Sequence, residues 1–153
     1  MKFISTRGKD GPISFETALL NGLARDGGLY LPVSWPRFNL DEILQMTDLS
    51  YSDLAGLIMS RFTDGEIDQV EMTSLARQSY ADFTHPDVAP LRPVAENIHI
   101  LELFHGPTIA FKDYAMQFLS RVFDRALTRQ NRTAVILGAT SGDTGSAALE
   151  AFK

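Results

Sequence analysis

The 153-residue chain contains no cysteine. This absence excludes disulfide bonds, thiolate zinc ligands and a cysteine nucleophile. The chain also lacks an apolar run long enough to cross a bilayer, and its first residues do not contain the apolar stretch of a secretory signal. We therefore expect a cytoplasmic protein that does not enter a membrane.

A strong excess of positive charge is missing as well. The net charge is -5 and the pI is about 5.1, with acidic and basic residues interleaved along the chain. This pattern offers no basic stripe for nucleic acid. The apolar fraction of 44% is ordinary for a globular protein and argues against wholesale disorder. We expect a solvated, soluble surface that does not bind nucleic acid.

Residues 1–95 are predicted to form a mainly helical region with short strands. Lys2–Thr6 and Leu29–Pro32 have the pattern of short extended segments, and Ser14 can cap a helix. Between residues 40 and 83, three apolar stripes follow at helical spacing. Because these stripes have polar opposite faces and no clustered reactive groups, we interpret them as packing elements.

Residues 96–153 are predicted to begin an α/β domain. Ile98–Phe104 is rich in β-forming residues, and a long amphipathic helix begins near Lys112 or Asp113. Thr133–Leu137 is continuously apolar, as is typical of a strand buried on both faces of a parallel sheet. A loop and another helix follow, so we predict a βαβα unit with helices packed on a mostly parallel sheet.

The last predicted helix has barely two turns before Lys153. A parallel strand needs neighbours on both sides, and most of these neighbours are absent from the chain. We therefore expect a truncated protein rather than a small complete domain.

A glycine-rich loop, Gly138 to Gly145, follows the predicted buried strand and opens a helix. Open α/β sheets bind ligands at this position, and backbone N–H groups at a helix start favour an anion. Gly138, Gly142 and Gly145 let the backbone approach a carboxylate or phosphate closely, and Thr140, Ser141 and Thr144 add hydroxyl donors. The glycine spacing fits neither a Walker A loop nor a dinucleotide fingerprint. A strand-to-helix turn with a hydroxyl cap is the alternative reading.

Asp143 is unusual in such a loop because a carboxylate repels an anion. We expect its side chain to point away from the anion, toward a cationic amine or a cofactor hydroxyl.

Lys112 is the candidate nucleophile of a second loop, His105 to Asp113. It follows Ile109, Ala110 and Phe111 and lies where a helix begins. Apolar surroundings and the positive end of a helix dipole both disfavour the ammonium form. A neutral amine is what Schiff-base chemistry requires. His105 can donate a proton or orient the loop, and we favour the structural role.

Together the two loops resemble a known pattern. Phe111-Lys112-Asp113 after His105-Gly106-Pro107-Thr108 resembles the pyridoxal-phosphate (PLP) lysine segment of threonine synthases. The segment from Thr140 to Ala148 resembles their substrate-binding loop. Ser5 to Gly8 and Phe15 to Pro32 resemble the N-terminus of the bacterial and fungal members. The resemblance covers nearly the whole chain.

The resemblance implies PLP fold type II, which is like the β subunit of tryptophan synthase, and conversion of O-phospho-L-homoserine and water to L-threonine and phosphate. Lys112 would hold PLP and then move protons, while PLP acts as the electron sink. Thr140, Ser141, Gly142 and Thr144 would bind the substrate α-carboxylate. Asp143, an asparagine in many wider relatives, would lie near the cofactor hydroxyl.

Family members are considerably longer, and their binding groups for the PLP phosphate and pyridine nitrogen lie downstream of Lys153. We therefore expect residues 1–153 alone to be inactive and to bind PLP weakly. The sequence does not determine the oligomeric state.

Three other readings stay open at this point. One is a different fold type II PLP lyase or dehydratase. Another is an aspartic protease, because Asp143-Thr144-Gly145 matches its Asp-Thr-Gly triplet, although such enzymes pair two carboxylates in a β-rich fold. The last is a non-catalytic binding domain on the same scaffold.

Overall fold

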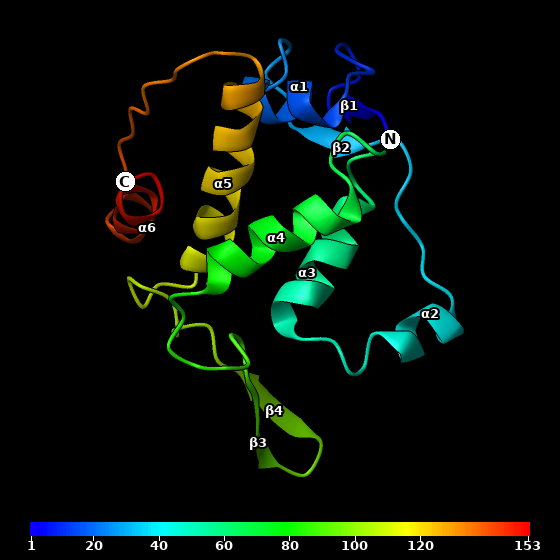
Figure 1. Ribbon diagram of the computed structural model, residues 1–153. Coiled ribbons are helices and arrows are strands. Elements are labelled where there is room, and N and C mark those ends of the chain that lie inside the picture. The colour runs from blue at the N-terminus through cyan, green and yellow to red at the C-terminus, as the bar shows by residue number, and fades with distance from the viewer. The chain divides into compact units, whose positions relative to one another are not determined.

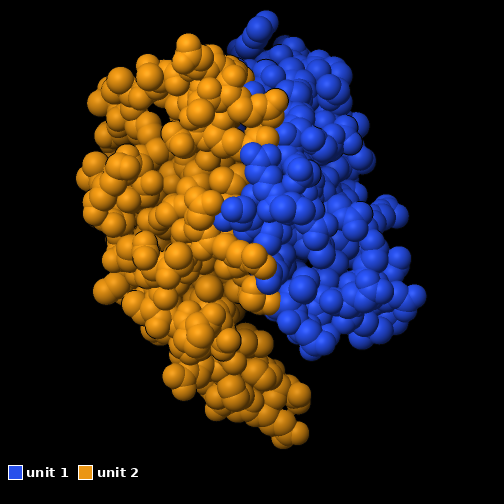
Figure 2. Space-filling model, in the orientation of Figure 1, with its two compact units in different colours: residues 1–49, 53–74 blue, residues 50–52, 75–153 orange.

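The computed structural model describes all of residues 1–153, which fall into two compact units (Figure 2). Unit 1 comprises residues 1–49 and 53–74, and unit 2 comprises residues 50–52 and 75–153. The expected division into a helical region, residues 1–95, and an α/β domain, residues 96–153, stays a prediction.

Unit 1 begins with a small antiparallel pair of strands. β1 (Phe3–Ser5) pairs with β2 (Tyr30–Pro32), as the two extended segments of the sequence predict. Between them lies α1 (Phe15–Asn21), where the Ser14 hydroxyl accepts a hydrogen bond from the Thr17 amide at 3.2 Å. α2 (Leu40–Gln45) follows and begins with a complete capping box.

Two further helices, α3 (Tyr51–Ser60) and α4 (Gln69–Tyr80), have one end in each unit. Within unit 1, Gly56 of α3 packs directly on Thr73 of α4, because a Cβ at Gly56 would lie 2.5 Å from the Thr73 Cα. Met72 is fully buried in the same region. The close approach of the helices therefore depends on glycine at this position.

Unit 2 contains a hairpin and two helices of its own (Figure 1). β3 (Leu91–Ala95) and β4 (Ile98–Leu101) pair antiparallel, and every residue of both strands is exposed. α5 (Asp113–Arg129) buries the predicted apolar row of Phe118, Val122 and Ala126. α6 (Asp143–Ala151) packs on α5, with the Phe123 and Phe152 rings 6.2 Å apart.

An aromatic cluster fills the space beside the start of α5. Its members are Tyr51, Tyr80, Phe83 and Tyr114, with ring centroids 4.8–6.3 Å apart and edge-to-face packing. The cluster anchors the first turn of α5 on the connector before β3, because the Tyr114 hydroxyl donates to the Val88 carbonyl at 2.7 Å.

The predicted strands of unit 2 require correction. Ile98–Phe104 forms a strand only to Leu101, and that strand pairs antiparallel with β3. Thr133–Leu137 forms no strand, and Val135 and Leu137 are 96% and 97% exposed. A parallel strand needs a partner at its edge, and both sheets of the structure are antiparallel pairs, β1 with β2 and β3 with β4. The parallel pairing is therefore absent among residues 1–153.

The last helix begins at Asp143, within the segment from Gly138 to Gly145 that was expected to be a loop. No helix combines the length and apolarity needed to span a membrane. No cluster of His, Asp and Glu side chains suits a metal ion.

Candidate active site

Lys112 lies at the residue before α5, where the chain turns into the helix. Its carbonyl accepts the first helical hydrogen bond, from the Met116 amide at 2.9 Å. The side chain is half-buried, and its amine lies 4.7 Å from the centre of the Phe111 ring. The predicted position of Lys112 at a helix start is therefore confirmed.

The Lys112 side chain lines an open cavity of about 430 Å³. The walls are mostly apolar and aromatic; the lining residues are Tyr51, Leu103, Phe111, Lys112, Tyr114, Ala115, Met116 and Thr144. Burial raises the pKa of both the Tyr51 and the Tyr114 phenol, so these groups stay protonated at neutral pH. The cavity thus offers one primary amine, one threonine hydroxyl and flat aromatic surfaces.

Asp113, next to Lys112, is completely buried. Its carboxylate accepts hydrogen bonds from the Thr108 amide at 2.8 Å and the Thr108 hydroxyl at 2.7 Å. Gly106 packs against this carboxylate so closely that a Cβ there would lie 2.5 Å from Asp113 Oδ2. The loop before Lys112 is therefore tied to the first residue of α5.

His105 joins the beginning of the same loop to the hairpin. Its Nε2 lies 2.7 Å from Glu102 Oε2, and Arg92 Nε donates to Glu102 Oε1 at 2.9 Å. The hydrogen bond with His105, followed by the charge of Arg92, lowers the pKa of the Glu102 carboxyl. His85 packs on the His105 ring at 5.0 Å. These contacts agree with a structural role for His105.

The predicted binding residues of the glycine-rich loop have different surroundings in the structure. The Thr140 hydroxyl accepts hydrogen bonds from the Gly142 amide at 3.2 Å and the Gly145 amide at 2.9 Å, so it closes the turn into α6. Ser141, Gly142 and Asp143 are exposed. Thr144 alone among the predicted binding residues lines the cavity of Lys112.

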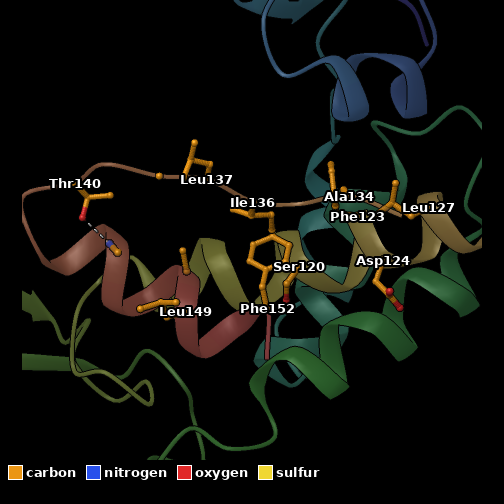
Figure 3. A pocket seen from close by; sticks show the side chains of 13 residues that line it. Ser120, Phe123, Asp124, Leu127, Ala134, Ile136, Leu137, Thr140, Leu149 and Phe152 are labelled. Atoms are coloured by element: carbon orange, nitrogen blue, oxygen red, sulfur yellow. Dashed lines mark hydrogen bonds between the residues drawn. The ribbon is translucent and has the colours of Figure 1, made fainter. Parts of the chain in front are cut away.

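A larger open cavity of about 610 Å³ lies between α5, α6 and the extended segment 134–140 (Figure 3). Thr140 and Gly145 line one end of this cavity. The remaining walls are mainly apolar, with Phe123 and Leu127 from α5, Ile136 from the extended segment, and Leu149 and Phe152 from α6 and its end. The exposed run predicted as a buried strand thus forms one wall of this hollow.

The structure therefore brings Lys112 and Thr144 together, and it gives Thr140 the capping role that the sequence left open. Tyr51 was not predicted as part of the site, because its sequence position, at the start of α3, carries no signal of a contact with α5. Asp143 begins a helix in a largely helical unit, which is unlike the β-rich setting of an aspartic protease.

The chain is similar to known proteins over nearly all of its length. Residues 2–80 match the family model described as the threonine synthase N terminus. Over 150 residues the chain is 49% identical to a threonine synthase of Pseudomonas aeruginosa, an alignment that covers 98% of this chain and 32% of the relative. A threonine synthase of Schizosaccharomyces pombe is 42% identical over 158 residues, covering 97% of this chain and 31% of the relative.

Solved structures give the same result. A PLP-bound threonine synthase from Brucella melitensis superposes with a TM-score of 0.96 at 49% identity, over 99% of this chain and 33% of that one. The yeast threonine synthase superposes with a TM-score of 0.88 at 40% identity, again over 99% and 33%.

These superpositions confirm the fold class, an α/β protein corresponding to the N-terminal region of such enzymes. The chain belongs to the threonine synthase family. It spans about a third of the length of the relatives that it matches.

Proposed function

We propose that this chain is the N-terminal part of a threonine synthase that converts O-phospho-L-homoserine and water to L-threonine and phosphate. The observation that carries the proposal is the position of Lys112, at the start of α5 in an aromatic-walled cavity that it shares with Thr144. The family membership of the chain supports the particular reaction.

The residues of the Lys112 cavity fit PLP on chemical grounds. A half-buried primary amine can bind the aldehyde carbon of PLP covalently, and the faces of Tyr51, Phe111 and Tyr114 suit a flat pyridine ring. When bound, PLP supplies an electron sink for carbanion chemistry. Lys112 Nζ would hold the cofactor and, once released from it, carry a proton at the same place.

The loop before α6 would bind the substrate. Its backbone N–H groups and the positive end of α6 favour the α-carboxylate, and the hydroxyls of Ser141 and Thr144 can donate to it. Glycine is favoured at position 142, because its φ of +134° is a conformation that side chains disfavour. Thr140 holds this turn through its two accepted amides. Asp143 would face the cofactor hydroxyl.

The test is release of phosphate from O-phospho-L-homoserine, together with formation of L-threonine, by the complete gene product supplied with PLP. We expect one threonine for each phosphate. Phosphate release with a ketoacid product instead would identify another PLP lyase or dehydratase. No product of either kind, from a protein that holds PLP, would refute the proposed reaction.

Residues 1–153 by themselves should be inactive and bind PLP weakly. The binding groups expected for the PLP phosphate and the pyridine nitrogen are not among the residues that line the Lys112 cavity. We also propose a cytoplasmic location for the protein.

A further inference from the structure

We propose that Asp113 and Thr108 act as a pair of positioning residues that hold Lys112 in place for reaction with the aldehyde of its cofactor. This inference rests on the proposed function, because it takes Lys112 as the reacting amine. It adds two residues to which the sequence analysis gave no role.

The buried Asp113 carboxylate accepts two hydrogen bonds from Thr108. A carboxylate without exposure to water is costly unless hydrogen bonds compensate it. Here both oxygens accept from one residue, Oδ2 from the Thr108 amide and Oδ1 from the Thr108 hydroxyl. These charge-assisted bonds are of the stronger kind, and together they fix both the position and the orientation of Thr108 relative to α5.

The Asp113 carboxylate points back toward the loop before Lys112. An acidic residue in the first turn of a helix ordinarily stabilises the exposed amides of that turn. Asp113 instead bonds backward to the loop, and Gly106 makes room for it at a distance that no other residue would allow. The contact therefore serves the loop before Lys112 rather than the end of the helix.

We call the hydrogen bonds between Thr108 and Asp113 the clamp. The backbone between these two residues is strained at Ile109. Ile109 has a φ of +66° and is 71% exposed, so no burial of its own side chain explains this conformation. A β-branched residue in the left-handed region is a genuine outlier and persists only where its surroundings enforce it. The clamp at Thr108 and the turn bond from the Ile109 amide to the Gly106 carbonyl supply that enforcement.

Lys112 lies inside the segment that the clamp closes. With Thr108 and Asp113 fixed to each other, the backbone of Lys112 cannot rotate independently of α5, and its side chain is directed along the wall of the cavity. Loss of the clamp should release the loop and lower the fraction of molecules in which the amine meets an aldehyde correctly.

The experiment compares Thr108→Val with Thr108→Ser in the complete gene product. Valine has nearly the shape of threonine but lacks the hydroxyl, whereas serine keeps the donor. The initial rate of PLP attachment at Lys112 is measured by borohydride trapping and peptide mass spectrometry. Far-UV circular dichroism and the Tm of the cofactor-free protein are measured alongside.

We expect Thr108→Val to lower the attachment rate by about tenfold and Thr108→Ser to restore it to within about twofold of wild type. Far-UV circular dichroism should be unchanged in both variants. Equal rates in all three proteins would overturn the clamp. A loss of rate that follows Tm equally in both variants would also overturn it, because it would indicate support of the fold alone.

A second readout separates this inference from the proposed function. Trinitrobenzenesulfonate labels lysine amines without any cofactor, and Lys2, Lys9 and Lys153 serve as internal references. Suppose that the wild-type protein attaches no PLP at Lys112, but Thr108→Val still changes the pH profile of labelling at Lys112 alone. The proposed function is then refuted, and the positioning of Lys112 by Thr108 and Asp113 is supported. If that profile is also unchanged, the clamp fails as well.

Discussion

Lys112 and Thr144 line the same cavity although they belong to the starts of different helices, α5 and α6. The packing of α6 on α5 brings them together. Lys112 supplies an amine and Thr144 a hydroxyl. These are the groups that the proposed function needs, the amine to bind the cofactor and the hydroxyl to bind the substrate. The consequences can be tested residue by residue.

The two threonines of the glycine-rich loop should respond differently to loss of their hydroxyls. Thr140→Val removes the acceptor of two amides, so we expect the free energy of unfolding to fall by about 1 kcal/mol, as for a lost helix cap. Thr144→Val should leave stability unchanged and raise KM for O-phospho-L-homoserine about tenfold, since a hydrogen bond to a charged group is lost. Urea unfolding and steady-state kinetics measure the two effects.

Serine at each position is the matched control, because it keeps the hydroxyl. Thr140→Ser should retain stability and Thr144→Ser should retain KM. A stability loss on Thr144→Val, or none on Thr140→Val, would contradict the separation of cap and binding group.

Gly56→Ala should destabilise the protein even though alanine is the better helix former. The intrinsic gain in a helix is about 1 kcal/mol. The added methyl group would lie 2.5 Å from the Thr73 Cα, and a backbone atom cannot move aside as a flexible side chain can. Overpacking of this kind costs about 1–3 kcal/mol. We expect a net loss in urea unfolding of the complete gene product.

Gly138→Ala is the comparison, because a methyl group at Gly138 meets nothing within 4 Å and the backbone there is not left-handed. It should change the free energy of unfolding very little. An increase in stability for Gly56→Ala would show that α3 and α4 are further apart than described.

The Glu102 carboxyl should contribute to acid sensitivity. Its pKa is lowered in the folded protein by the hydrogen bond with His105 and the charge of Arg92. A carboxyl with a lowered folded pKa stabilises the protein above its unfolded pKa, close to the ordinary value of 4.5, and this contribution is lost as pH falls through the folded value. Glu102→Gln should therefore flatten the fall in stability below about pH 4.5.

The control is Glu96→Gln in the exposed turn of the same hairpin, which should keep the wild-type slope. The measurement is the urea midpoint as a function of pH. Identical slopes for wild type and Glu102→Gln would show that the bonds of Glu102 with His105 and Arg92 do not persist in solution.

Much of the helical structure could be predicted from the sequence, because local signals determine it. Ser14 caps α1 and the apolar row of α5 is buried as its spacing indicates. The strands of unit 2 could not be predicted in the same way. Thr133–Leu137 has the composition of a buried strand, but pairing depends on residues elsewhere, and Ile98–Leu101 pairs with its sequence neighbour.

The residues of the candidate site likewise include some that local sequence signals predict and some that they do not. Lys112 and Thr144 were predictable because each lies in a short motif at a helix start. Tyr51 and the clamp of Asp113 on Thr108 were not, because a burial-dependent contact leaves no periodic pattern. Nothing in the amino-acid sequence distinguishes Asp113 from an ordinary acidic residue in the first turn of a helix.

The central claim is that Lys112 carries the cofactor. The most direct measurement is to incubate the complete gene product with PLP, reduce it with borohydride and map the modified peptides. The account predicts stoichiometric modification at Lys112, little at Lys2, Lys9 and Lys153, and none of the specific label in Lys112→Arg. Label spread evenly over Lys2, Lys9, Lys112 and Lys153, or an unmodified Lys112 in a protein that releases phosphate from O-phospho-L-homoserine, would contradict this claim.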